Sequence, residues 1–354
     1  MTTLGRSPWV GLFATVLAVV LPVGADPTVG PLFPVHKDGK WGYIDRTGRI
    51  VVEPKFDNAE RFSEGFAAVV ADGRHGYIDK TGAMALVPRE KPAGAVHRPF
   101  RDGLAAVHAE GGIGFLDRTG KLIIPARFSS AEDFSEGLAF ACDRVGCGYI
   151  DRMGHGALGP GFLGGAPFRG GVAAVWVGKS DMGGKRYVLY DRKRGRLTGD
   201  WESAGTLSDG LIAVRTQGRW GYVDREGRGV IRPQFAGAGE FAGGLAPVSE
   251  QAWTCGYADS AGKLLIPARF RNCYSFYEGL ARVEILGPDP KRPQAAFIDR
   301  TGRVVIEGAA ATPPFETAED FIDGLAAVEA PGTSGGTRRG YIDIDGHYVW
   351  PLTE

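Results

Sequence analysis

A unit of 33 to 44 residues that recurs nine times constrains the fold of this chain more than any other feature. The first half of every unit ends at an aspartate, and these residues are Asp45, Asp79, Asp117, Asp151, Asp191, Asp224, Asp259, Asp299 and Asp343. A unit this short cannot bury an apolar face alone, so the units are expected to stack on one another. No linker interrupts the series, and residues 26–354 are therefore predicted to form one domain of nine units.

Each unit is predicted to contain three short antiparallel strands. Residues 39–69 are the best copy, with Trp-Gly-Tyr-Ile and Arg-Ile-Val-Val as two strands and a Leu-Ala-Ala-Val type segment as the other. Asp-Arg-Thr-Gly is expected to form the turn between the Trp-Gly-Tyr-Ile strand and the Arg-Ile-Val-Val strand, which is the third of the unit. Asp can accept hydrogen bonds from the amides ahead of it, and Gly accepts a positive φ. Pro54 is expected to end the third strand, since proline cannot donate a hydrogen bond. The stretch from Phe56 to Phe62 is then expected to cross to the next unit.

The composition supports an all-β protein. The chain has 55 glycines among regularly placed β-formers, which indicates many tight turns between short strands. Two ways of stacking the units would bury their faces: a closed, propeller-like ring or an open β-superhelix. Alanine-rich strands would suit crowding near a ring axis, and we favour the ring. The superhelix stays open as the alternative, because nine blades exceed the usual four to eight.

The repeat resembles a known family. Lys40-Trp41-Gly42-Tyr43-Ile44-Asp45 and residues 219–224 (Arg-Trp-Gly-Tyr-Val-Asp) are each followed by a glycine turn and a Val/Ile strand. These segments, with the Phe-Ser-Glu-Gly-Leu-Ala connector at 134–139, are similar to bacterial WG (KWG) repeats. The resemblance extends over essentially all of residues 26–354. It implies a repeat scaffold to which no general biochemical activity is attached.

The first 25 residues have a different character. Arg6 precedes an apolar run from Trp9 to Val23, which ends in the small residues Gly24 and Ala25. This pattern predicts a signal peptide over residues 1–25, cleaved before Asp26, with an uncleaved anchor as the alternative. The mature protein is expected to be secreted or periplasmic, with no transmembrane span after cleavage.

Four cysteines fit such a compartment, because disulfides persist where the surroundings are oxidising. Cys142 and Cys147 flank a four-residue turn, and Cys255 and Cys273 lie close together in the repeat. We expect two local bridges, Cys142 with Cys147 and Cys255 with Cys273, although four cysteines allow three pairings. Their spacing matches no familiar zinc site.

Motifs that resemble catalytic sequences do not have the required context. Gly332–Gly336 (Gly-Thr-Ser-Gly-Gly) matches a hydrolase nucleophile elbow and is followed by Asp345 and His347, but no helix follows the serine. A hydrolase using this loop is a distant alternative. Residues 343–346 (Asp-Ile-Asp-Gly) resemble the start of a calcium loop without its downstream acidic ligand. We therefore predict no enzyme activity, no metal and no cofactor.

Charged residues recur with the period. A basic residue usually follows the turn aspartate, as in Arg46, and an acid usually precedes the connector glycine, as in Glu64. Antiparallel strands place both at one end of the sheet, where they could pair. We interpret the turn aspartates as locks on their own turns and the other charges as a solvated rim.

Function in repeat arrays tends to lie where a loop departs from the period. Three hairpins are long: Trp176 to Arg186, Glu284 to Gln294 and Glu329 to Arg338. They share an excess of cationic residues, and the weak binding candidates are Lys179, Lys185, Arg186, Lys291, Arg292 and Arg338. The hairpins would lie at one end of the strands. Free variation of surface hairpins in length is the competing explanation.

The function predicted from these observations is a non-catalytic, extracytoplasmic scaffold that binds a protein or a cell-envelope polymer. The basic hairpins favour an acidic partner. The chain has no net charge, which gives no reason to expect nucleic acid. A glycan or cell-wall binding module is the alternative if enough tryptophans are exposed, namely Trp41, Trp176, Trp201, Trp220 and Trp253.

Overall fold

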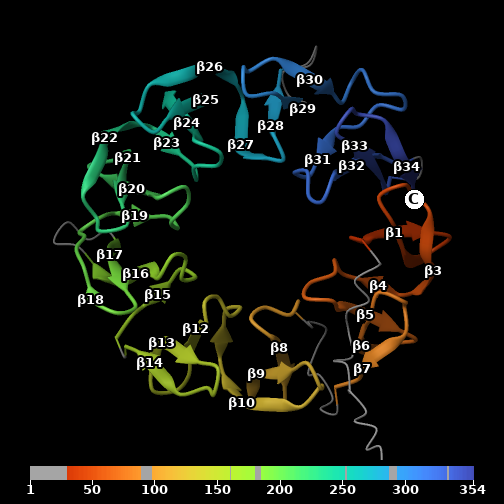
Figure 1. The fold of residues 1–354 in the computed structure, drawn as a ribbon, viewed down its shortest axis with the longest axis horizontal. Coiled ribbons are helices and arrows are strands. Elements are labelled where there is room, and N and C mark those ends of the chain that lie inside the picture. The colour runs from red at the N-terminus through yellow and green to blue at the C-terminus, as the bar shows by residue number, and fades with distance from the viewer. Residues whose placement is uncertain are drawn as a thin grey trace, which may run out of the picture.

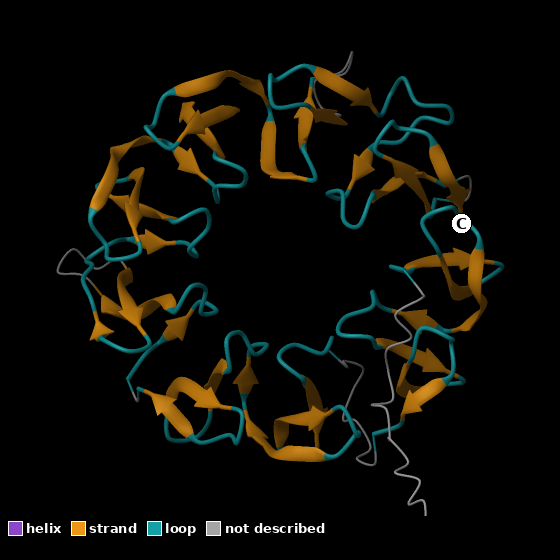
Figure 2. Cartoon of the chain, viewed as in Figure 1, coloured by secondary structure: helices purple, strands orange, loops and turns teal. Residues whose placement is uncertain are grey.

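Nine small antiparallel sheets stand side by side around a ring (Figure 1). The computed structural model describes residues 30–88, 98–159, 161–179, 185–251, 253–286, 293–332 and 335–354. Within these ranges the regular elements are all strands (Figure 2), and none of these residues forms a helix long and apolar enough to cross a membrane. The prediction of an all-β ring is confirmed. The predicted signal peptide lies outside the described residues.

We number the sheets as blades 1 to 9 in chain order. The strands of blades 1 to 4 are β1 (Phe33–Lys37), β2 (Lys40–Ile44) and β3 (Ile50–Phe56); β4 (Asn58–Ala59), β5 (Ala67–Ala71), β6 (Arg74–Ile78) and β7 (Met84–Leu86); β8 (Leu104–Ala109), β9 (Gly112–Asp117) and β10 (Leu122–Phe128); and β11 (Ser130–Ala131), β12 (Leu138–Cys142), β13 (Cys147–Asp151) and β14 (Gly156–Leu158). Those of blades 5 and 6 are β15 (Gly164–Gly165), β16 (Val172–Lys179), β17 (Lys185–Asp191) and β18 (Gly195–Arg196); and β19 (Ser203–Ala204), β20 (Leu211–Thr216), β21 (Arg219–Asp224) and β22 (Gly229–Phe235). Those of blades 7 to 9 are β23 (Gly237–Ala238), β24 (Leu245–Gln251), β25 (Thr254–Asp259) and β26 (Leu264–Phe270); β27 (Asn272–Tyr277), β28 (Leu280–Ile285), β29 (Gln294–Ile298) and β30 (Val304–Glu307); and β31 (Thr317–Ala318), β32 (Leu325–Pro331), β33 (Thr337–Asp343) and β34 (Tyr348–Thr353).

Seven of the nine sheets have a fourth strand that the sequence pattern did not predict. In blade 2 it is β4, whose residues Asn58 and Ala59 pair with Val70 and Val69 of β5. The connector, expected only to cross between units, therefore begins with the innermost strand of the next blade. Two residues are too few to show the alternation by which strands are recognised.

The third strand continues through its proline, so the expectation that Pro54 ends it was wrong. β3 runs from Ile50 to Phe56, and its pairing with β2 shifts register between Trp41 and Tyr43. This strand is the outermost of its sheet. A proline is tolerated there, because no further strand lies beside an edge strand to accept the hydrogen bond that proline cannot donate.

The register shift explains the glycine that follows the tryptophan in the repeat. In blade 6 a Cβ built on Gly221 would lie 2.4 Å from the carbonyl oxygen of Ile231 and 2.7 Å from the nitrogen of Pro233. Both atoms belong to the backbone of the outer strand β22, which cannot move aside as a side chain could. A glycine is needed here for close backbone approach.

We therefore expect Gly221→Ala to lower the free energy of unfolding by about 1–3 kcal/mol, the usual cost of overpacking. Gly229→Ala is the matched control in the same blade, because nothing lies within 4 Å of a Cβ at Gly229. This control is expected to change stability little. Denaturant unfolding of both variants checks the prediction, and equal stabilities would contradict it.

The blades are held together by a repeated tyrosine. In blade 6, Tyr222 is buried, donates its hydroxyl to the carbonyl oxygen of Gly239 in blade 7 (2.9 Å) and packs edge-on against Phe241. The same bond to the inner strand or loop of the next blade is formed by Tyr43, Tyr77, Tyr149 and Tyr257. Each of these blades is thus bonded to its successor by one buried phenol, whereas Phe115, Leu189 and Phe297 take the place of the tyrosine in blades 3, 5 and 8.

Blade 9 meets blade 1 and closes the ring (Figure 1). Phe33 and Val35 of β1 share one apolar cluster with Leu325 and Tyr341. The hydroxyl of Tyr341 donates to the carbonyl oxygen of Pro34 (3.0 Å), and Thr353 Oγ1 donates to that of His36 (2.7 Å). The two ends of the array are in direct contact, which excludes the open superhelix.

Both predicted disulfides are confirmed. Cys142 and Cys147 face each other across the β12–β13 hairpin, with Cα atoms 4.0 Å apart. Cys255 on β25 and Cys273 on β27 are bonded with Cα atoms 6.0 Å apart. The first bridge closes a hairpin within blade 4, and the second joins blade 7 to blade 8.

Candidate functional site

The turn aspartates lock their own turns, as the sequence analysis proposed. In blade 1, Asp45 Oδ1 accepts hydrogen bonds from Thr47 N (2.9 Å), Thr47 Oγ1 (2.6 Å) and Arg49 N (3.2 Å). These bonds, with that of the Thr47 hydroxyl the strongest, lower the pKa of Asp45 to about 2. Because its hydrogen-bonding capacity is used within its own turn, the Asp45 carboxylate has a structural role.

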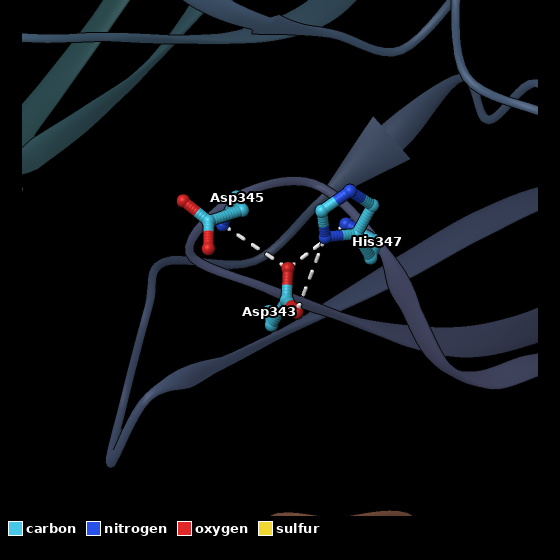
Figure 3. Close-up of side chains that lie close together, drawn as sticks. All are labelled: Asp343, Asp345 and His347. Carbon is cyan, nitrogen blue, oxygen red and sulfur yellow. Dashed lines mark hydrogen bonds and ion pairs between the residues drawn. The ribbon is translucent and has the colours of Figure 1, made fainter.

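The ninth turn brings Asp343, Asp345 and His347 together (Figure 3), with potential ligand atoms all within 4.8 Å of one another. Asp343 Oδ1 already accepts the amides of Asp345 (3.1 Å) and His347 (2.9 Å), as Asp45 does in blade 1. His347 Nδ1 lies 3.6 Å from the other oxygen of Asp343. The group repeats the geometry of the other turns, and we assign no ion to it.

The charged rim differs from the expected set of pairs within one unit: its bonds run between blades. Glu136 of blade 4 accepts the amides of Gly170 (2.6 Å) and Gly171 (2.9 Å) of blade 5. Arg192 of blade 5 returns a bond to the carbonyl oxygen of Glu136 (2.5 Å). Glu136 is the first residue of a tight two-residue turn and has a φ of +53°. This backbone conformation directs its side chain toward the next blade.

This pattern recurs around the ring. A loop acid accepts a glycine amide of the next blade in the pairs Glu64–Gly103, Asp102–Gly137, Asp209–Gly244 and Glu278–Gly324. The basic residue after the turn aspartate reaches the loop of the preceding blade at Arg46, Lys80, Arg118 and Arg300. Burial alone would raise the pKa of Glu64, but the bonds from Arg118 and Gly103 outweigh it, and the pKa is lowered. The rim therefore joins blades together.

A hollow of about 700 Å³ on this rim extends over blades 2 to 4. Glu64, Asp102 and Arg118 in its lining belong to the inter-blade bonds just described. These three side chains are thus already paired with the chain itself.

The described cations of the long hairpins are engaged within their own regions. Lys185 Nζ lies 4.6 Å from the centre of the Trp176 ring. Arg186 pairs with Asp200 (3.0 Å), and Arg338 Nε donates to the carbonyl oxygen of Pro331 (3.1 Å). Among the other candidates, the backbone of Lys179 ends β16, whereas Lys291 and Arg292 lie outside the described residues.

The three long hairpins belong to different parts of the ring. Lys185 and Arg186 begin β17 of blade 5, and Arg338 lies on β33 of blade 9, on the opposite side of the ring (Figure 1). Each hairpin joins the second and third strands of its blade, so all three lie at the same end of the strands. They share a face of the molecule, but the structure does not bring the cations of blades 5 and 9 together.

One candidate tryptophan among the described residues is well exposed. Trp253, at the tip of the β24–β25 hairpin, is 83% exposed. The others, Trp41, Trp176, Trp201 and Trp220, are half-buried. The row of exposed rings that a glycan site would need is absent from this part of the chain.

The loop that resembles a nucleophile elbow lies apart from its supposed partners. Residues 333 and 334 are outside the described residues, and β33 separates Gly335 from Asp345 and His347. A strand of this length spans about 20 Å, so Asp345 and His347 do not approach the loop.

A hollow on the inner side of the ring was not foreseen from the sequence. It has a volume of about 590 Å³ and is lined by residues of blades 9, 1, 2 and 3. Its lining is both apolar and charged: Pro34, Trp41, Asn58, Ala59, Glu60, Arg61, Phe62, Ser63, Pro99, Arg101, Glu319, Ile322 and Arg339. We call it the seam hollow. It adjoins blade 1, whose sheet begins with β1 and has three strands among the described residues.

Comparison with known proteins agrees with the repeat described above. A family model described as WG containing repeat matches residues 41–74, 113–143, 220–251 and 256–287. These four segments are WG repeats. They fall in blades 1 to 4 and 6 to 8, and the WG repeat accordingly includes the tryptophan-position strand, its turn and the connector to the next blade.

One of the similar solved structures shows the same fold. A structure titled "Crystal structure of the eukaryotic initiation factor" has a TM-score of 0.65 and 11% identity, with 92% of this chain and 97% of that chain covered. "Dihydro-heme d1 dehydrogenase NirN in complex with DHE" has a TM-score of 0.49 and 11% identity, with 82% and 74% covered. At such identities the first likeness shows the fold alone. No curated protein matches the sequence.

Proposed function

We propose that this β-propeller with WG repeats is a non-catalytic extracytoplasmic scaffold. The observation that carries the proposal is the use of its chemically reactive side chains to build the ring. The turn aspartates bind their own turns, loop acids such as Glu136 bind the next blade, and the tyrosines donate to backbone carbonyls. A catalytic group must instead be directed at a substrate.

An oxidising compartment is part of the same proposal. Two disulfides, Cys142–Cys147 and Cys255–Cys273, hold the only four cysteines of the chain. Disulfides persist in secreted and periplasmic proteins and are rare in the cytosol. Together with the predicted signal peptide over residues 1–25, they support secretion or export to the periplasm.

The binding surface we propose is the end of the strands that carries the long hairpins, with a protein or an acidic envelope polymer as partner. Lys185 is exposed there, and Trp253 lies at the tip of a hairpin at the same end of blade 7. Exposed aromatic and cationic side chains on surface loops are common in binding surfaces.

The test is a double charge reversal, Lys185→Glu with Arg338→Glu, in the mature protein. Binding to envelope fractions in a sedimentation assay is expected to fall several-fold and to weaken as salt rises, because exposed charges are screened. Lys263→Glu is the matched control, since Lys263 is an exposed cation in the turn after β25, at the other end of the strands. Unchanged binding by the double variant would contradict the proposed face.

A further inference from the structure

The seam hollow lies beside blades 1 and 3, the two blades whose described sheets have no inner fourth strand. In blade 2, the inner strand β4 lies against β5 through the pairs Asn58–Val70 and Ala59–Val69. In blade 1, β1 corresponds to β5 of blade 2, and it is the first strand of the described sheet. The inner side of β1 therefore contributes Pro34 to the wall of a hollow instead of supporting another strand.

The sequence register shows which residues correspond to the inner strand. Val35 and His36 hold the places of Val69 and Val70, because Phe33 pairs with Ile44 as Ala67 pairs with Ile78. Residues 24 and 25 then correspond to Asn58 and Ala59. They are the last two residues of the predicted signal peptide, so cleavage before Asp26 would remove them from the chain.

An added β-strand does not suit the hollow. Pro34 has no N–H to donate, and its carbonyl oxygen already accepts the Tyr341 hydroxyl. The carbonyl oxygen of His36 accepts Thr353 Oγ1. Because strand addition depends on free main-chain donors and acceptors, an occupant must be held by side chains.

The side chains of the hollow combine apolar walls with a positive charge. Trp41 and Phe62 are half-buried in it, and Ile322 is 45% exposed. Arg61 and Arg339 share the single carboxylate of Glu319, at 2.6 and 2.5 Å. With Glu60 and Arg101 included, three guanidinium groups face two carboxylates.

Arg101 is the cation available to a ligand. It is exposed, and its guanidinium forms no ion pair within the described part of the chain. Arg169 of blade 5 occupies the place that Arg101 has in blade 3. The backbone of Arg101 pairs with Leu104 at the start of β8, and that of Arg169 pairs with Val172 at the start of β16. There the guanidinium of Arg169 binds the carboxylate of Glu240 at 3.2 Å. The position thus binds a carboxylate of the chain in one blade and faces an open hollow in the other.

We propose that the seam hollow binds a compact ligand carrying one aromatic or branched apolar group and one carboxylate. The apolar group packs between Trp41, Phe62 and Ile322, and the carboxylate pairs with Arg101. The hydrophobic C-terminal residue of a peptide and a free aromatic acid share this chemistry. The volume of about 590 Å³ lies within the range of small-ligand pockets.

The test is calorimetric titration of the mature protein with N-acetyl-tryptophan, with N-acetyl-tryptophanamide, and with a tetrapeptide ending in tryptophan. The acid is expected to bind at least several-fold more tightly than the amide. Tighter binding of the tetrapeptide than of N-acetyl-tryptophan identifies a peptide terminus as the ligand, and equal or weaker binding identifies a free acid. Absence of binding by all three probes, or equal binding of acid and amide, overturns the proposal.

Two variants locate the site. Arg101→Ala, which removes a side chain that forms no ion pair with any described residue, is expected to reduce binding of the acid to the level of the amide. Arg169→Ala is the matched control from blade 5 and should leave binding unchanged. Ile322→Glu should weaken binding of the acid further by placing a negative charge at the hollow. Equal affinities of the two arginine variants would overturn the assignment. The hairpin variant Lys185→Glu should bind these probes normally, so this inference and the proposed function can fail separately.

Discussion

Raising the pH above about 10 is expected to destabilise the ring steeply. Tyr43, Tyr77, Tyr149, Tyr222, Tyr257 and Tyr341 are buried between blades, and burial raises the pKa of each phenol above its ordinary value of 10. In the unfolded chain they would ionise near the ordinary value. Because the folded pKa lies above the unfolded one, the stabilisation is complete below about pH 10 and is lost as the pH rises further.

The expected size follows from the linkage relation. Each buried tyrosine reduces the free energy of unfolding by about 1.4 kcal/mol for every pH unit above 10, until its folded pKa is reached. Six such groups together remove about 8 kcal/mol per pH unit, which is comparable with the whole stability of a typical domain. The ring should therefore unfold within about one pH unit.

Denaturant unfolding at a series of alkaline pH values measures the slope, and tyrosinate absorbance should appear together with unfolding. Tyr222→Phe is the control, because it removes one of the six phenols and should reduce the slope by about a sixth. Its cost near neutral pH is expected to be about 1 kcal/mol for the lost hydrogen bond to Gly239. If the six tyrosines of the folded protein titrated near the ordinary tyrosine pKa of 10, this account would be contradicted.

Removing both disulfides is expected to lower the free energy of unfolding by about 5 kcal/mol. Cys255 and Cys273 are 18 residues apart, and closing a loop of this length in the unfolded chain corresponds to about 3 kcal/mol. Cys142 and Cys147 are five residues apart, which corresponds to about 2 kcal/mol. The longer loop constrains the unfolded chain more.

The two double variants, each with both cysteines of one bridge changed to serine, separate these contributions in denaturant unfolding. The Cys255/Cys273 variant should be the less stable, and it should also loosen blade 7 against blade 8, with faster amide exchange in β25 and β27. The Cys142/Cys147 variant should affect exchange in blade 4 alone. A larger loss from the hairpin bridge than from the inter-blade bridge would contradict the loop-length argument.

The parts of the fold that were predicted from sequence are those that repeat locally. The turn at Asp45 is determined by residues within four positions, and the Cys142–Cys147 bridge joins the two sides of one hairpin. Stacking of the units also follows from repetition, because similar units must bury similar faces, although the same repetition is compatible with an open superhelix. Such features need no knowledge of distant partners.

The features that were missed depend on neighbours in space. Glu136 and Arg192 recur with the period, but nothing in the period shows that they bond between blades. Arg61 and Glu319 are 258 positions apart and meet only because the ring closes. The seam hollow is produced by the same closure. A repeat pattern describes one unit, whereas these contacts belong to junctions between units.

Closure of the ring has a consequence for how such a protein can change in evolution. Blade 1 is built from residues 33–56 and blade 9 from residues 317–353, so no described sheet combines strands from both ends of the chain. Duplication or deletion of one whole unit would then add or remove a complete blade and leave all the others intact. A unit that has the repeat tyrosine and the loop acid would form the same phenol-to-carbonyl and carboxylate-to-amide bonds at its new junction. Propellers of this construction can alter their blade number, and with it their diameter, by a single genetic event.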